Sequence, residues 1–439
     1  MDQLVSRLLL YGDLGEEAIL SKLAALFQAW KGSSMPRQTL VRGIYHQVKG
    51  LLDLATEYGF DENLWQNYLT FLLMTNENSF SLITERVGAQ DGSVNHFARN
   101  DFRVFRALFH YDFSAVEGDL NLDCFTTLSH YKAIAKHGRR YNQNVSEKVR
   151  DLSRRLAAAP DDETFFRLVT EHYRQYGVGM LGLNKAFRIQ SGPEGIGFIP
   201  IYNTDKVMLR DLVGYESQKA QLRHNTEAFL AGRSANNALL YGDAGTGKSS
   251  SVKALINEYY DQGLRMIEIY KHQFRDLSAV IAKVKNRNYR FIIFIDDLSF
   301  EENEVEYKFL KAVIEGGVET KPDNILLYAT SNRRHLVRQT FSERAGEEIE
   351  NDVHHSDTLE EKLSLSARFG VRINYSIPNR TQFQEMVLTL AQRQGLTVPA
   401  EVLLAEANKW ELRHGGVSGR TAQQFINYMA GSPPSEAKG

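Results

Sequence analysis

Residues 242–249 read Gly242-Asp243-Ala244-Gly245-Thr246-Gly247-Lys248-Ser249, which fits the spacing G-x-x-x-x-G-K-[ST] of a phosphate-binding loop. An apolar run over 238–241 predicts a buried strand before the loop, and the residues from Ser250 onward predict a helix. Glycines let the backbone wrap around phosphate oxygens, and the first N–H groups of such a helix, with Ser250 among them, point at the anion. We therefore expect Lys248 against the β- and γ-phosphates of a nucleotide and the Ser249 hydroxyl on Mg²⁺. This strand–loop–helix context disfavours a chance match in a glycine-rich turn.

The composition is that of a soluble globular protein with room for two or three domains. The chain has 439 residues, of which 43% are apolar and 24% charged, and its net charge of −2 provides no overall attraction to nucleic acid or acidic membranes. Cys124 is the one cysteine, so an intrachain disulfide and a cysteine metal cage are excluded. The sequence contains no apolar run as long as a membrane span and no secretory signal pattern at its start, so we expect a cytoplasmic protein.

Hydrophobic periodicity divides the chain into a helical first half and an alternating second half. Apolar residues at three- and four-residue spacing predict an all-α N-terminal domain over 1–189, to which we assign client or partner binding. Three glycines and two prolines between 190 and 200 predict a linker over 190–204. Strands alternating with helices predict an α/β core over 205–378, a parallel sheet wrapped by helices. Residues 379–430 predict a small helical lid, and 431–439 a flexible tail. The strands are expected at 238–241, 265–270, 291–296, 325–331 and 371–377.

Two features of the first half have competing interpretations. Its aromatic residues, such as Trp65 and Tyr68, form either a core or a partner groove, and we favour the core. A basic cluster forms either a nucleic-acid surface or a solvated helical face. Glu147 and Asp151 interrupt the cluster, which favours the solvated face. Its members are Lys132, Lys136, Arg139, Arg140, Lys148, Arg150, Arg154 and Arg155, with Tyr131 and Tyr141 interleaved.

A second apolar run, 291–295, ends in two acids, Asp296 and Asp297. A buried strand of a parallel sheet delivers such carboxylates to the edge at which the phosphate loop opens. We expect Asp296 to hold Mg²⁺ through water and Asp297 to polarise an attacking water. Asp296 as a plain helix cap is the weaker alternative, and Glu301 or Glu302 are alternative bases.

Three further polar residues follow strands or open helices. Asn332 ends the strand 325–331 and is expected to orient water or the γ-phosphate, unless it is a plain strand end. Arg368 lies at a predicted helix end, from which it could reach the nucleotide of a neighbouring subunit or pair locally with Glu360 or Glu361. Arg420 opens the last helix and is expected near the nucleotide of its own subunit, with a surface role as the alternative. The rivals of Arg368 are Arg333, Arg334, Arg344 and Arg372.

Taken in this order, the motifs resemble those of the AAA+ ATPases. Residues 242–249 resemble the Walker A motif and 291–297 Walker B, and Val213-Gly214 resembles the segment that covers adenine. Asn332 resembles sensor 1, Arg368 the arginine finger and Arg420 sensor 2. The resemblance covers 205 to about 429. It implies an ATP- and Mg²⁺-dependent hydrolase that forms homo-oligomeric rings or spirals and drives conformational change in a client.

Finer features are similar to one AAA+ family, catalogued in bacteria as domain of unknown function 815. The segments that carry this likeness are 211–216, 296–301, 329–336 and 361–366. The pair Asp296-Asp297 departs from the commoner Asp-Glu and is similar to that of replication initiators and helicase loaders. It therefore leaves a second hypothesis open, a nucleotide-gated switch, scaffold or loader with low turnover. Residues 271–274 lack the aromatic–apolar–glycine pattern of threading unfoldases, so threading is not predicted. A small-molecule kinase ranks below both hypotheses, because it does not account for Arg368, Arg420 and the lid.

Overall fold

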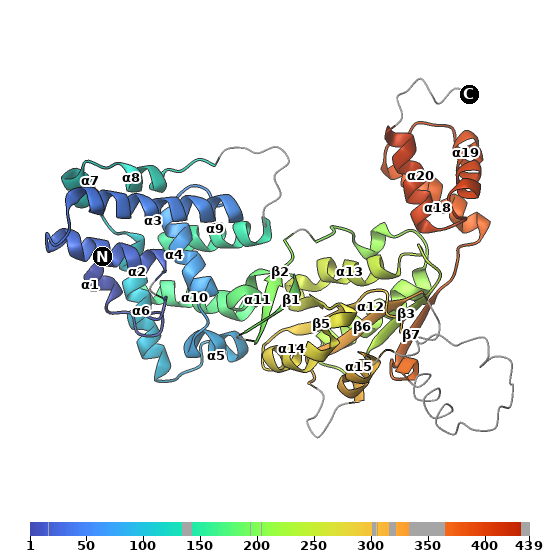
Figure 1. Ribbon diagram of the computed structural model, residues 1–439, viewed down its shortest axis with the longest axis horizontal. Coiled ribbons are helices and arrows are strands. Elements are labelled where there is room, and N and C mark those ends of the chain that lie inside the picture. Colours follow the sequence, from blue (N-terminus) through green and yellow to red (C-terminus); the bar gives the residue numbers. More distant parts are fainter. Residues whose placement is uncertain are drawn as a thin grey trace. The chain divides into compact units, whose positions relative to one another are not determined.

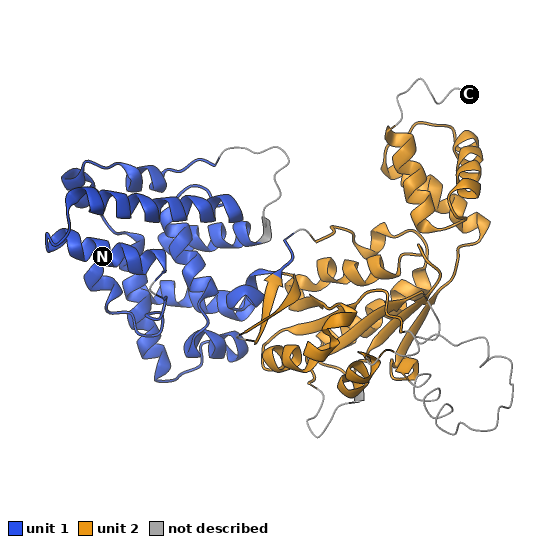
Figure 2. Cartoon of the chain, viewed as in Figure 1, with its two compact units in different colours: residues 1–184, 200–203 blue, residues 185–199, 204–439 orange. Residues whose placement is uncertain are grey.

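The protein folds into two compact units, which Figure 2 distinguishes by colour. The first comprises residues 1–184 and 200–203, and the second 185–199 and 204–439. The computed structural model describes residues 1–15, 17–133, 143–193, 195–202, 204–300, 304, 306–315, 322–332 and 365–431.

The first unit is built from helices packed around one aromatic-rich core. Helix α4 lies centrally and packs against α3, α6, α8, α9 and α11, because it is apolar on nearly all sides. Trp65 and Tyr68 of α4 are both 4% exposed, so the interpretation of these residues as core is confirmed. The helices are α1 (Asp2–Val5), α2 (Ile19–Lys31), α3 (Arg37–Tyr58), α4 (Leu64–Thr75), α5 (Ser79–Val87), α6 (Val94–Phe109), α7 (Ser114–Leu120), α8 (Cys124–Ser129), α9 (Gln143–Ala157), α10 (Asp162–Tyr176) and α11 (Gly179–Leu183).

Two arginines of the described part of the basic cluster are paired with acids. Arg150 lies 3.2 Å from Glu62, and Arg155 lies 3.6 Å from Asp151 and 3.9 Å from Glu171. These pairs favour a solvated helical face over a nucleic-acid surface. Other members of the cluster lie outside the described residues, namely Lys136, Arg139, Arg140 and Tyr141.

A buried carboxylate anchors the N-terminal segment of the first unit. Asp101 of α6 is fully buried and accepts hydrogen bonds from the backbone N–H groups of Leu9, Leu10 and Tyr11, at 2.8–3.1 Å. Several N–H donors stabilise a buried charge that would otherwise be costly. Asp101 thus ties residues 9–11 to a helix about ninety positions later in the chain.

We expect Asp101→Asn to lower the free energy of unfolding of the first unit by about 2–4 kcal/mol, because the amide group sets its own N–H donors against the backbone donors. Urea denaturation followed by tryptophan fluorescence in a Trp410→Phe background measures this, since the two remaining tryptophans both lie in the first unit. Asp53→Asn, at an exposed pair with Lys49, is the control and should change the value by less than about 0.5 kcal/mol. Equal losses in the two variants would contradict the anchoring role.

The second unit is a seven-stranded sheet in the order β2-β1-β4-β5-β6-β3-β7 (Figure 1). Pairing is parallel from β1 through β4, β5, β6 and β3 to β7. The middle strands β5 and β6 are almost wholly buried, as expected for a parallel sheet covered on both faces. The predicted α/β core, a parallel sheet wrapped by helices, is therefore confirmed. The strands are β1 (Ala186–Gly192), β2 (Gly195–Pro200), β3 (Ala238–Gly242), β4 (Leu264–Glu268), β5 (Arg290–Ile295), β6 (Ile325–Ser331) and β7 (Val371–Tyr375).

The predicted linker over 190–204 is wrong for most of its length. Residues 186–192 and 195–200 form β1 and β2, which extend the sheet beyond β4. Phe187 and Ile196 are buried, and β1 pairs with β4 in the register Phe187↔Ile267. The glycines and prolines obscured this alternation of buried and exposed residues. Pairing with a strand some 80 residues later, which local sequence does not reveal, stabilises the segment.

Helices cover both faces of the sheet and form a separate bundle at the C-terminal end. In Figure 1, α13 lies over one face of the sheet, and α14 and α15 lie along the other. Helices α18, α19 and α20 pack around their own apolar core, including Phe383, Leu403 and Phe425, and constitute the predicted helical lid. The elements are η1 (Leu209–Asp211), α12 (Glu216–Leu230), α13 (Lys248–Tyr259), η2 (Tyr260–Gln262), η3 (Lys271–Asp276), α14 (Leu277–Val284), α15 (Glu306–Glu315), α18 (Arg380–Arg393), α19 (Ala400–Arg413) and α20 (Gly419–Gly431).

Among the helices of the described ranges, none is both long and apolar enough to cross a bilayer.

Candidate nucleotide-binding site

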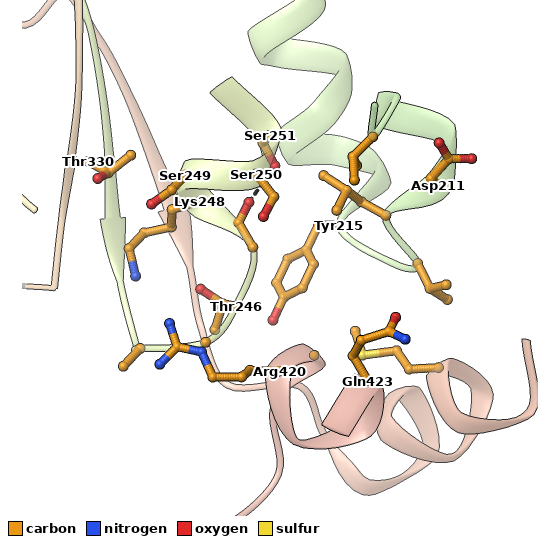
Figure 3. A pocket seen from close by; sticks show the side chains of 18 of the residues that line it. Asp211, Tyr215, Thr246, Lys248, Ser249, Ser250, Ser251, Thr330, Arg420 and Gln423 are labelled. Carbon is orange, nitrogen blue, oxygen red and sulfur yellow. Dashed lines mark hydrogen bonds between the residues drawn. The ribbon is translucent and has the colours of Figure 1, made fainter. Parts of the chain in front are cut away.

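A pocket of about 880 Å³ opens in the second unit at the C-terminal edge of the sheet. It is lined by the phosphate loop from Ala244 to Ser249, by the start of α13, and by polar residues at the ends of β5 and β6. The base loop, defined here as residues 211–215, and the lid helices α18 and α20 complete the lining. In Figure 3, Lys248 and Arg420 extend on the phosphate-loop side, Asp211 lies across the pocket, and Gln423 comes from the lid. Ligands of open parallel sheets bind at this edge, so the topology places the pocket where a nucleotide is expected.

The phosphate loop leaves β3 at Gly242 and enters α13 at Lys248. Gly242 has φ +128°, and a Cβ atom there would lie 2.2 Å from the carbonyl oxygen of Tyr375 in β7. A side chain is therefore excluded at this position. The next residue, Asp243, donates its N–H to Tyr375 at 2.9 Å, and its carboxylate accepts from the N–H of Ile377 at 2.8 Å. These bonds join the loop to the connection that leads into the lid.

Lys248 is held inside the pocket with only 6% of its surface exposed. Its ammonium donates to the carbonyl oxygens of Gly242 and Asp243, at 3.0 and 2.5 Å, and to Asn332 Oδ1 at 2.9 Å. Burial lowers the pKa of Lys248 below its ordinary value, Asp243, Asp297 and Asp296 act in the opposite direction, and Arg420 adds to the lowering. A desolvated cation bound to neutral acceptors is well placed to bind an anion instead.

Asp296 lies at the end of β5 and contacts the first turn of α13. Its Oδ1 accepts hydrogen bonds from Ser249 Oγ at 2.5 Å and Thr330 Oγ1 at 2.6 Å, and its Oδ2 lies 3.6 Å from Lys253 Nζ. The hydroxyl of Ser249 and the carboxylate of Asp296 are hard oxygen donors of the kind that Mg²⁺ prefers. Over the described ranges, His, Cys, Asp and Glu form no group of three suited to a metal ion. The residues present therefore fit Mg²⁺ that arrives with nucleotide phosphates.

Asp297 has an unusual backbone, with φ +52° for a residue other than glycine. Its N–H donates to Thr330 Oγ1 at 3.0 Å, and its Oδ1 accepts from Asn332 Nδ2 at 2.9 Å. Asn332 thus contacts Lys248 through its oxygen and Asp297 through its nitrogen. The structure brings together Lys248, Ser249, Asp296, Asp297 and Asn332.

The lid contacts the phosphate loop through the start of α20. The N–H of Arg420 donates to the carbonyl oxygen of Gly245 at 3.1 Å. A Cβ atom on Gly245, which has φ +75°, would lie 3.2 Å from Arg420 Cβ and 3.0 Å from Ser418 Oγ. The Arg420 side chain is exposed and lines the pocket. Together with the bond from Ile377 to Asp243, this contact binds the phosphate loop to the last helix of the lid and to the connection that precedes its first helix.

The opposite wall of the pocket is the base loop, which contains the predicted residues Val213 and Gly214. Gly214 has φ +79°, and Tyr215 follows it with φ +59°. The Tyr215 ring lies 5.0 Å from that of Tyr375, and burial raises the pKa of Tyr215 to about 12. Val213 and Tyr215 both pack against the apolar core of the lid. This wall is therefore apolar and shared between core and lid.

Arg368 does not line this pocket, although it belongs to the described residues. It is half-buried and lies just before β7. Arg372, one of its rivals, is exposed on β7. The other candidates for the role of Arg368 lie outside the described residues, as do its possible ion-pair partners: Arg333, Arg334, Arg344, Glu360 and Glu361. The alternative bases, Glu301 and Glu302, also lie outside them.

Several pocket residues were missed by the sequence analysis. Thr330 lies within a segment quoted for its likeness, but no spacing rule singled it out. Lys253 does not line the pocket but lies 3.6 Å from Asp296; it follows Ser249 by four positions, one helical turn along, which does place it near the acids. Met386 and Arg393 of α18 line the pocket from the lid, and helical periodicity alone gives no signal for such contacts.

Similarity to solved structures covers about half of the chain. The AAA domain of FIGL-1 in complex with ADP aligns with 52% of this chain and 74% of that one, at 18% identity and a TM-score of 0.36. The Thermotoga maritima RuvB Holliday junction branch migration motor aligns with 51% of this chain and 64% of that one, at 16% identity and a TM-score of 0.36.

Two sequence comparisons locate the chain among known proteins. Over 84 residues it is 40% identical to the replication factor C large subunit of Staphylothermus marinus, a match that spans 19% of each chain. A family description, "Protein of unknown function (DUF815)", matches residues 183–433, which is more than half of the 439. The chain therefore belongs to this family, as the motifs of its second half predict.

Proposed function

We propose that the second unit binds ATP with Mg²⁺ and hydrolyses it, and that hydrolysis drives conformational change in a client bound by the first unit. One observation carries the proposal. Four polar residues from three different segments line one pocket: Lys248, Asp296, Asp297 and Asn332. They lie within hydrogen-bonding reach of one another or of shared partners. Such a set of a buried cation, two acids and an amide beside a phosphate loop suits phosphoryl transfer.

The residues have separable roles in this mechanism. The N–H groups at the start of α13 and the Lys248 ammonium bind the phosphates, and Lys248 exchanges its carbonyl acceptors for phosphate oxygens. Ser249 and Asp296 would hold Mg²⁺, which neutralises charge on the phosphates when bound. Asp297 and Asn332 orient and polarise the attacking water. Arg420 contacts the phosphates from the lid.

Arg368 supports assembly of several copies. It lies outside the pocket of its own chain, so its charge can assist hydrolysis only at the site of a second copy. We therefore propose a homo-oligomeric ring or spiral in which each Arg368 completes a neighbouring site. The client is a protein that binds the first unit; a nucleic-acid partner has no support from the paired basic face.

Asp297→Asn tests whether Asp297 is the general base of ATP hydrolysis. We expect it to lower ATP turnover by about a hundredfold or more, because a neutral amide cannot accept a proton from water. ATP affinity should stay within about threefold. A phosphate-release assay with Mg²⁺, run beside equilibrium binding of ATP, measures both quantities. Asp261→Asn, at an exposed position of η2, is the control and should match the wild type.

A second candidate function is a nucleotide-gated switch or loader with low turnover. It is favoured by Asp297, whose short carboxylate is bound to Asn332 and whose backbone is left-handed. If the wild type binds ATP tightly, and its turnover is at background and unchanged by Asp297→Asn, this second function replaces hydrolysis. If the wild type hydrolyses ATP and Asp297→Asn does so equally fast, Asp297 is not the general base.

A further inference from the structure

The base loop is bonded to the lid as well as to the core. Arg393, at the last position of α18, donates from Nη1 to the carbonyl oxygen of Asp211 at 2.5 Å and from Nη2 to that of Arg210 at 3.1 Å. The planar guanidinium thus spans two successive carbonyls, that of Asp211 at the start of the base loop and that of Arg210 just before it. Arg393 lines the pocket, although it belongs to none of the motifs in the sequence.

Two further contacts bind the same loop to the lid or its connection. A Cβ atom on Gly214 would lie 3.1 Å from Met386 Cε, so α18 packs directly on the loop backbone. The hydroxyl of Tyr215 donates to the carbonyl oxygen of Ser376 at 2.8 Å, in the segment that leads into α18. The loop therefore contacts the lid at its two ends and its centre.

The loop is also fixed to the core, on its other side. Lys219 of α12 is 5% exposed and donates to the carbonyl oxygen of Leu212 at 2.7 Å. The N–H of Leu209 donates to Glu258 of α13 at 2.8 Å, and the Leu209 side chain is fully buried. Glu258 lies in the last turn of α13, away from the phosphate loop that precedes the helix, so the base loop and the residues just before it are fixed to the core helices as well as to the lid.

We propose that Arg393 is a positioning residue that clamps the base loop to the lid and sets how long a nucleotide stays bound. The inference rests on the proposed nucleotide site and adds the residue that regulates it. While Arg393 is bonded to the two carbonyls, the base loop moves together with α18 and the wall over the nucleotide base stays closed. With the clamp broken, the loop leaves the lid and the base escapes, while the phosphates keep all their contacts. Arg393 therefore acts on the base-bearing end of the ligand alone.

The test compares a probe that has a base with one that has none. The release rate of N-methylanthraniloyl-ADP is measured by chasing with ADP, and the affinity of inorganic tripolyphosphate by competition with the same probe. We expect Arg393→Met to raise the ADP release rate about tenfold, equivalent to about 1.4 kcal/mol, and to change tripolyphosphate affinity less than twofold. Arg393→Lys keeps the positive charge but cannot donate to both carbonyls as the guanidinium does. Its release rate should therefore lie between those of the wild type and Arg393→Met.

Arg380→Met is the matched control, because Arg380 opens the same helix, is exposed and does not line the pocket. It should leave both measurements unchanged. A release rate in Arg393→Met within twofold of the wild type overturns the clamp, and so does an equal weakening of both probes. A wild-type rate in Arg393→Lys overturns the forked contact. If the wild type binds neither probe, the proposed function fails too; if it binds both, a failure belongs to the clamp alone.

Discussion

Replacing Lys248 by alanine will lower ATP affinity by at least about a hundredfold, or about 2.7 kcal/mol. The ammonium is 6% exposed and is held by two carbonyls and Asn332, so it is already desolvated before it meets an anion. Charge-assisted hydrogen bonds to phosphate oxygens contribute about 1.5–3 kcal/mol each. Lys248→Ala removes the bonds that the ammonium would make to these oxygens. Equilibrium titration with a fluorescent ATP analogue measures the loss.

Lys409→Ala provides the control for Lys248→Ala, because Lys409 is an exposed lysine of the lid, paired with Glu406. Its affinity for ATP should equal that of the wild type. Circular dichroism should show that both variants are folded. Unchanged affinity in Lys248→Ala would remove the assignment of this loop as the phosphate site.

Replacing Arg368 by alanine will lower ATP turnover by about a thousandfold and leave ATP affinity within about threefold. An arginine that stabilises the transferring phosphoryl group contributes about 10³–10⁵ to the rate in comparable enzymes. Its effect on binding is small if it contacts the nucleotide of another subunit only in the transition state. Turnover and equilibrium binding, measured on the same preparation, separate these two effects.

Assemblies mixed from two different variants test whether Arg368 acts at the site of a neighbouring subunit. Lys248→Ala subunits lack the phosphate contact but carry an intact Arg368, and Arg368→Ala subunits have the reverse defect. Each variant alone should be inactive, whereas a random one-to-one mixture should regain up to about a quarter of wild-type turnover, because about one interface in four is then complete. A mixture as inactive as its components contradicts a role in trans. Arg372 is an exposed residue of β7, and Arg372→Ala should keep wild-type turnover. A loss there instead would identify Arg372 as the arginine concerned.

The phosphate site was predictable from the sequence because its chemistry is local. A glycine loop between a strand and a helix places Lys248 and Ser249 by itself, and the ends of β5 and β6 bring the acids and Asn332 to the same edge. Side-chain geometry was not predictable. The left-handed backbone of Asp297 and the bond from Asn332 to Asp297 depend on Thr330 from the adjacent strand.

Contacts distant in sequence account for the rest of what was missed. The strands β1 and β2 exist because β4 offers a free edge for pairing, and glycine and proline spacing cannot reveal that. Arg393 and the carbonyl that it binds at Asp211 are 182 residues apart. Its helix was predicted from periodicity, but a surface arginine at a helix end is common, and its partner is a backbone oxygen with no sequence signature.

The attachment of the phosphate loop to the start of α20 and to the connection that precedes α18 gives the protein two built-in reporters. The amide hydrogens of Ile377 and Arg420 are each donated to the loop, one to Asp243 and the other to Gly245. Both become accessible to solvent deuterium when the lid leaves the loop, and both are protected when it stays. Peptides that contain these two amides, followed by mass spectrometry during exchange with and without nucleotide, would therefore time the opening of the lid without any label on the chain.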